Sequence, residues 1–149
     1  MRNCNLLLLT AFITGCYDIL LRYISENNLL QYDFVIALKP YFKKKTLLEG
    51  FLIAAFVGLV WQWIVLLIYG FPKSFIGLIG FFIVSFIIGG MLGIAMDKSN
   101  LFPDLSATQY KTLGRARSII TDSTSAIIVQ TTVLFFYLLY NFYLKKFRL

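Results

Sequence analysis

Residues 46–96 read TLLEGFLIAAFVGLVWQWIVLLIYGFPKSFIGLIGFFIVSFIIGGMLGIAM, and they contain two long apolar runs separated by a short turn. The runs, 46–69 and 74–96, are each longer than the roughly 20 residues that a helix needs to cross the hydrocarbon core of a bilayer. Glycine and proline lie close together between the runs, at Gly70 and Pro72, which is typical of a tight turn. The stretch therefore predicts two antiparallel membrane-spanning helices.

Two further apolar segments, 5–23 and 118–143, flank this hairpin. The 149-residue chain is 59% hydrophobic and only 14% charged, whereas soluble domains carry about 25% charged residues. The first segment continues past Cys16 into polar residues without a small-x-small cleavage site, so we interpret it as a retained helix and not a signal peptide. We predict an all-α polytopic membrane protein, with residues 1–149 forming one membrane domain of four spans.

The two long connections between spans are each expected to hold a short interfacial helix. In the first connection, apolar residues between 29 and 38 indicate an amphipathic helix that stops before Pro40. In the second, 106–109 has the spacing of a capping box. We therefore expect a surface helix from Asp104 to Arg117 that runs on into the fourth span.

The residue inventory argues against an enzyme. The chain has no histidine, which removes His-based acid–base catalysis and nearly every zinc site. Cys4 and Cys16 do not form a CxxC pair, and no catalytic or phosphate-binding motif occurs. We expect no catalytic activity, no cofactor and no metal.

The net charge of +7 points to lipid more than to nucleic acid, because the basic residues flank the apolar segments and form no long basic run. Four spans place both termini on one side. Lysine and arginine are more numerous on the other side, which predicts that the long connections face the cytoplasm. All the acidic residues also lie toward that side, so a net-charge count points the opposite way. The cytoplasmic set is Arg22, Lys39, Lys43, Lys44, Lys45, Lys98, Lys111, Arg115 and Arg117, against Arg2, Lys73, Lys145, Lys146 and Arg148.

Four ionisable residues near one membrane face are the main polar candidates, because ionisable groups inside a membrane are functional candidates by default. They are Asp18, Arg22, Arg115 and Asp122. One interpretation is structural: Asp18 and Arg22 can pair along one helix, and Arg22–Asp122 and Asp18–Arg115 pairs would lock the helices together. The alternative is a polar path for ions, lined by Asp18, Asp122 and Gln130.

Small residues in the third span predict close helix packing. Ser85, Gly89 and Gly93 are spaced by four, which gives one narrow face where another helix can approach. Its partner is either another span or a second copy of the chain. Contact with lipid or with partner proteins is expected at Lys43, Lys44, Lys45, Asp104, Lys111 and Arg117.

Two segments carry a resemblance to a known group of proteins: LKPYFKKKTLLEGFLIAAFVG at 38–58 and FPDLSATQYKTLGRARSIITDSTSAIIV at 102–129. With its Lys39–Phe42 and Phe102–Pro103 elements and its Asp-containing last span, the chain resembles small multi-spanning membrane proteins of nucleocytoplasmic large DNA viruses. The resemblance implies a protein of the internal virion membrane that contacts the capsid shell. It supplies no active-site residues.

Together these observations predict a structural integral membrane protein, most simply of a viral internal membrane, that anchors the bilayer to capsid or minor capsid proteins through its charged connections. Its expected partners are the lipid bilayer, capsid or membrane proteins and a second copy of the chain. The alternative is a small ion channel or transporter.

Overall fold

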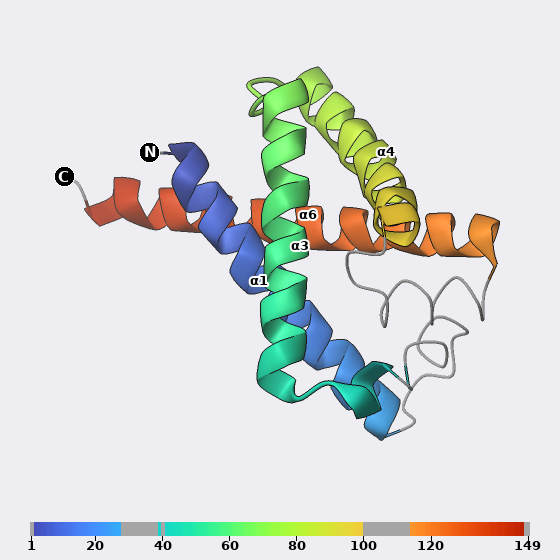
Figure 1. Ribbon diagram of the computed structural model, residues 1–149. Helices are drawn as coiled ribbons and strands as arrows, with labels where there is room; N and C mark the ends of the chain where they lie inside the picture. Colours follow the sequence, from blue (N-terminus) through green and yellow to red (C-terminus); the bar gives the residue numbers. More distant parts are fainter. Residues whose placement is uncertain (1, 28–38, 40, 100–113, 148–149) are drawn as a thin grey trace.

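The computed structural model describes residues 2–27, 39, 41–99 and 114–147, and most of them lie in four α-helices: α1 (Arg2–Glu26), α3 (Leu47–Ile68), α4 (Phe75–Ser99) and α6 (Arg115–Phe147) (Figure 1). Each helix contains a segment long and apolar enough to cross a membrane. These segments are Cys4–Glu26, Leu47–Ile68, Phe75–Met96 and Ala116–Phe142. The predicted all-α fold with four spans is confirmed.

The α3–α4 hairpin is closed by local capping interactions. Thr46 caps α3, where its side chain accepts a hydrogen bond from the backbone N–H of Glu49 at 3.2 Å. At the other end Tyr69 is the last residue before Gly70, whose φ of 85° is a left-handed conformation that glycine adopts without strain. Ser74 then accepts a hydrogen bond from the Gly77 N–H at 3.0 Å, at the start of α4.

The helices pack as two close pairs, α1 with α3 and α4 with α6. In the first pair, a Cβ added to Gly58 would collide with Thr14. In the second, a Cβ added to Gly89 would lie 2.6 Å from the Cβ of Ala126. Glycine at these contacts lets two backbones approach closely, which is how helices associate when lipid surrounds them.

Less extensive contacts join the two pairs, between α1 and α6 and between α3 and α4. In the view of Figure 1, α6 runs across behind α1 and α3. The main core cluster lies where the pairs meet and includes Leu6, Trp61, Phe81 and Val133. The pairs therefore meet through side chains from all four helices.

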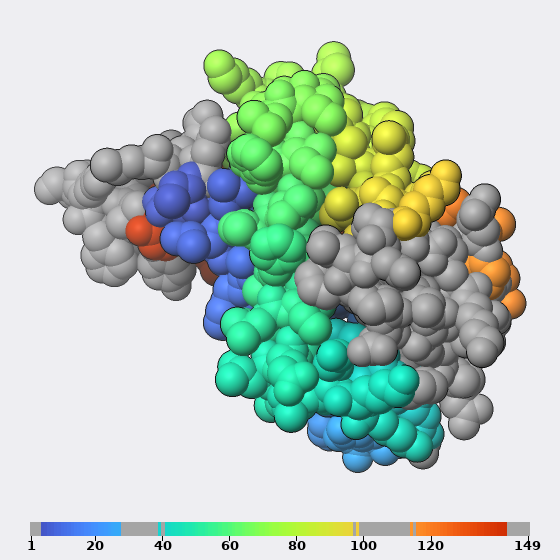
Figure 2. Space-filling model, viewed as in Figure 1, coloured from blue at the N-terminus to red at the C-terminus, as the bar shows by residue number. Residues whose placement is uncertain are grey.

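The distribution of polarity is the reverse of that in a soluble protein. Large apolar side chains cover the outside; Leu48, Leu67 and Ile76, for example, are 68%, 67% and 81% exposed. The outer face of α3 runs down the front of the molecule in Figure 2. Soluble monomers rarely expose apolar surface on this scale. The chain is a multi-pass integral membrane protein whose four candidate spans contact the lipid bilayer.

The connections are described only in part. Residues 41–44 form a helical turn that leads into α3. The predicted interfacial helix at 29–38 and most of the predicted surface helix at 104–117 lie outside the described residues. The expected continuity of that second helix into the last span is wrong at Gly114, because its φ of 84° lies outside the right-handed helical region and α6 begins only at Arg115.

Candidate functional site

A buried hydrogen-bonded network joins all four helices near the middle of the spans. The side-chain amides of Gln62 in α3 and Gln130 in α6 form a reciprocal pair: the Nε2 of Gln62 donates to Gln130 Oε1 at 2.8 Å, and the Nε2 of Gln130 donates to Gln62 Oε1 at 2.9 Å. Gln62 also donates to Thr10 Oγ1 of α1 at 3.1 Å, and Gln130 donates to Ser85 Oγ of α4 at 2.9 Å. Each helix therefore contributes one side chain.

This network satisfies the polar atoms that it buries. The four side chains are fully buried, at 0% exposure. The hydroxyl of Thr10 donates to the Leu6 carbonyl at 2.7 Å, and that of Ser85 donates to the Phe81 carbonyl at 2.7 Å. Interhelical hydrogen bonds in membranes contribute on average about 0.6 kcal/mol each, with individual values up to about 2. The network thus holds the α1/α3 pair to the α4/α6 pair.

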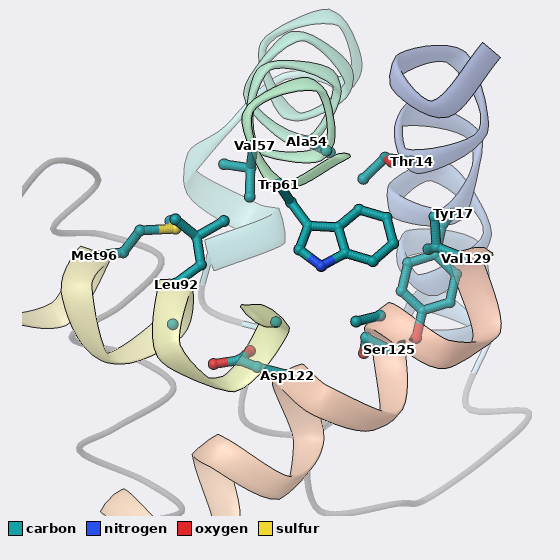
Figure 3. Close-up of a pocket in the computed structure, with 14 residues that line it drawn as sticks. Thr14, Tyr17, Ala54, Val57, Trp61, Leu92, Met96, Asp122, Ser125 and Val129 are labelled. Atoms are coloured by element: carbon teal, nitrogen blue, oxygen red, sulfur yellow. Dashed lines mark hydrogen bonds between the residues drawn. The ribbon is translucent and has the colours of Figure 1, made fainter. Parts of the chain in front are cut away.

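Beside the network lies a partly open cavity of about 190 Å³. Trp61 of α3 forms part of its wall, and the indole Nε1–H donates to the Ser85 carbonyl at 3.2 Å. Figure 3 shows Trp61 between α1, α4 and α6, with Asp122 and Ser125 of α6 at the cavity edge. The lining residues are Thr14, Tyr17, Ala54, Val57, Gly58, Trp61, Gly89, Leu92, Gly93, Met96, Asp122, Ser125, Ala126 and Val129.

Arg22 binds the backbone just before α3. This is the end of the molecule where Lys43, Lys44 and Lys45 lie, and it is called the basic end below. Its guanidinium donates from Nη1 to the carbonyls of Phe42 and Lys45, at 2.8 and 2.7 Å, and from Nη2 to the carbonyl of Thr46 at 3.3 Å. It also lies over the ring of Phe42, 5.4 Å from its centroid. Arginine suits this role because its planar fork presents several donors in a fixed arrangement.

Asp18 lies one helical turn before Arg22, and both side chains approach Gly50 of α3. A Cβ added to Gly50 would lie 2.7 Å from Asp18 Oδ2 and 2.8 Å from Arg22 Nη2. Both residues are buried, at 9% and 7% exposure, and Asp18 Oδ2 and Arg22 Nε have no hydrogen-bond partner within the described part of the chain. The pairing of Asp18 with Arg22 or Arg115, and of Arg22 with Asp122, stays a prediction.

The small-residue face of α4 lies against α6. Gly89 approaches Ala126, Gly93 approaches the carboxylate of Asp122, and Ser85 is bonded to Gln130. Of the two partners left open by the sequence, another span of the same chain occupies this face in the structure. Asp122 is therefore at a helix contact as well as at the cavity edge, and it has interactions within the chain.

The residues predicted to contact lipid or partner proteins fall into two groups. Lys43, Lys44 and Arg117 are exposed, and Lys45 is half-buried at the turn that Arg22 binds. Asp104 and Lys111 lie outside the described residues.

Within the described part of the chain, no three His, Cys, Asp or Glu side chains come together as a metal site would require.

The Gln62–Gln130 pair was not predicted from the sequence, which indicated Gln130 only as a residue of the alternative ion path. An available signal was that each of these amides lies well inside an apolar span, where an unsatisfied polar group is costly and must find a partner. Of the two hydroxyl partners, Ser85 belongs to the predicted small-residue face of the third span, and Thr10 is a residue of the first span. No protein-family model, curated protein or solved structure matches this chain.

Proposed function

We propose that the chain is a structural protein of a membrane, a four-helix scaffold that presents its long charged connections to partner proteins on one side. The observation that carries this proposal is the Gln62–Gln130 network. Its four polar side chains are committed to one another and to backbone carbonyls, so they hold helices together. Neither a catalytic activity nor a cofactor is part of the proposal.

The contacts with partner proteins are proposed to lie at the basic end of the molecule. Lys43 and Lys44 are exposed, and Arg22 binds the backbone carbonyls on either side of them. The two positive charges therefore lie on a segment whose backbone is anchored to α1. Basic residues at membrane ends favour the cytoplasmic side and anionic headgroups. We place the long connections on the cytoplasmic side.

The resemblance of 38–58 and 102–129 to membrane proteins of large DNA viruses makes the proposal more specific. A membrane derived from the host endoplasmic reticulum turns its cytoplasmic face toward an assembling shell. The long connections would then lie on the capsid side and anchor the membrane to capsid or minor capsid proteins.

Particle purification tests this role. The protein should co-purify with virions and become extractable by detergent only after the shell is opened. A density map should then show a capsid protein against 98–117. Absence from purified particles contradicts the viral role, while leaving the membrane scaffold itself intact.

An ion or proton pathway is the second candidate, and one observation favours it. Asp18 is buried within a span, and its Oδ2 has no hydrogen-bond partner within the described residues. A buried intramembrane carboxylate is a functional candidate. However, Gln130, which this pathway would use, has its amide committed to Gln62 and Ser85.

Liposome flux separates the two candidates. Protein reconstituted at known density is assayed for proton and cation flux, with Asp18→Asn and Asp122→Asn as variants. The scaffold proposal expects no flux above that of empty liposomes for any of them. If the wild type shows flux and a folded Asp18→Asn variant does not, the scaffold proposal is wrong and the chain is a transporter.

A further inference from the structure

Several of the residues that line the cavity beside Trp61 are small. The helices pack closely within each pair, and the cavity lies between the two pairs. The small lining residues are Ala54, Gly58, Gly89, Gly93 and Ala126. All the lining residues belong to the four candidate spans, so the cavity lies within the part of the chain that crosses the membrane.

Its polar lining groups are largely occupied within the protein. The Thr14 hydroxyl donates to the Thr10 carbonyl at 2.6 Å, the hydroxyls of Tyr17 and Ser125 are bonded at 3.1 Å, and the Trp61 indole donates to the Ser85 carbonyl. Asp122 also has interactions within the chain. Water needs two to four polar partners to occupy a cavity stably, and these walls supply few that are not already used.

An apolar occupant fits these walls better than water. Apolar cavities of about 150 Å³ remain dry and take up molecules such as benzene, and this cavity is larger, at about 190 Å³. It is also partly open, and the spans that line it expose apolar side chains. The abundant apolar molecule around membrane-spanning helices is lipid, whose acyl chains are hydrocarbon.

We propose that the cavity between the two helix pairs is a lipid-binding site that takes up part of one acyl chain, with Trp61 in contact with the bound hydrocarbon. This goes beyond the scaffold role, since a bound chain would fill the space between the pairs. The Gln62–Gln130 network would hold the pairs together whether or not the chain is bound.

The two tryptophans of the chain provide a reporter and its control. Trp61 is 4% exposed and lines the cavity, whereas Trp63 is 54% exposed on the outside of α3. A Trp63→Phe variant leaves Trp61 as the only tryptophan, and Trp61→Phe leaves Trp63. Both are reconstituted in phosphatidylcholine vesicles with or without bromine atoms on the acyl chains, which quench indole fluorescence on close contact.

Emission from both reporters should be lost in brominated vesicles. Filling the cavity with Ala54→Leu should restore Trp61 emission to its level in unbrominated lipid, while Trp63 stays quenched. The adjacent Ala55→Leu, which adds the same volume at a residue that does not line the cavity, should restore neither. Leu92→Phe fills the cavity from α4 and replaces Ala54→Leu if that variant does not fold.

Three results would overturn the site. The first is Trp61 emission that bromine does not change while Trp63 is quenched. The second is quenching of Trp61 that persists in both folded filling variants, since lipid would then reach the indole by another route. The third is quenching of Trp61 by aqueous iodide and not by bromolipid, which would mean that water occupies the cavity.

Discussion

Gln62 and Gln130 are the residues through which the two helix pairs are joined. Their amides satisfy each other with bonds of 2.8 and 2.9 Å, and their remaining N–H groups reach Thr10 and Ser85. Removing one partner from a buried pair leaves the other unsatisfied, whereas replacing both by apolar groups can be nearly neutral. The network should therefore show strong coupling between its two members.

The corresponding test is a double-mutant cycle. We expect Gln130→Leu to lower the free energy of unfolding by about 1–3 kcal/mol, because the Gln62 amide loses its partner. Gln62→Leu should cost a similar amount, and the double variant should cost clearly less than the two together. The measurement is reversible unfolding in detergent micelles; additive effects would show that the pair is not coupled.

Arg22 is the second decisive residue, because it binds three backbone carbonyls near the start of α3. Lysine carries the same charge but lacks the planar fork, so the two are not equivalent here. The position of the exposed lysines at 43 and 44 therefore depends on a residue far from them in sequence.

Loss of this anchor should expose the turn to protease. We expect Arg22→Lys to increase the rate of tryptic cleavage after Lys43 and Lys44 in reconstituted protein, and Arg22→Ala to increase it further. Tyr23→Ala, at the exposed neighbouring position, serves as the control and should leave the rate unchanged. Equal rates in all four proteins would mean that the bonds to the carbonyls do not hold the turn.

At the scale of the helices, close glycine contacts determine which elements pair. Gly89 of α4 lies so near α6 that an added Cβ would meet Ala126 Cβ at 2.6 Å and the Asp122 carbonyl at 3.3 Å. A Cβ added to Gly77, in the same helix, would have one close neighbour, the Oγ of Ser74 at 3.1 Å. One helix thus contains both a crowded glycine and a comparatively open one.

Alanine at these two positions should have opposite effects. Gly89→Ala should destabilise the protein by about 1–3 kcal/mol through overpacking. Gly77→Ala should be neutral or stabilising by up to about 1 kcal/mol, because alanine favours helix. Adding Ala126→Gly to Gly89→Ala removes the methyl that collides and should recover part of the loss, as followed by thermal unfolding in micelles. Equal effects at 77 and 89 would contradict the proposed contact.

The spans themselves were predictable within a few residues, because a run of apolar side chains is a local property. Expected spans such as 74–96 agree with observed segments such as Phe75–Met96. The error at Gly114 is also local: a capping pattern at 106–109 does not reveal that a glycine farther along adopts a left-handed φ. The pairing of helices was not predictable, because many faces carry small residues.

For the whole molecule, the arrangement places one set of basic residues at the end where α1 finishes and α3 begins. Lys43 and Lys44 lie at this end, and Lys73 lies in the α3–α4 turn at the opposite end of the hairpin. In addition, α6 has 33 residues, which at 1.5 Å per residue is about 50 Å, well beyond the ~30 Å hydrocarbon core. A helix of this length tilts or extends past the membrane.

Side-specific labelling tests the proposed orientation. In a background with Cys4 and Cys16 replaced by serine, single cysteines are introduced by Lys44→Cys and Lys73→Cys. A membrane-impermeant maleimide should label position 44 only from the cytoplasmic side and position 73 only from the other. Reversed labelling would support the orientation indicated by net charge; labelling of both from one side would contradict the hairpin.

The sequence by itself determined that this is an α-helical membrane protein with four spans, because a backbone in lipid must satisfy its hydrogen bonds within each segment. The long apolar runs of such helices can be recognised directly from hydropathy. Only the tertiary structure decided that α1 pairs with α3 and α4 with α6, that Gln62 meets Gln130, and that a cavity remains beside Trp61. In lipid, helix association depends on close packing and on a few polar partners, and these are matched between residues far apart in the chain.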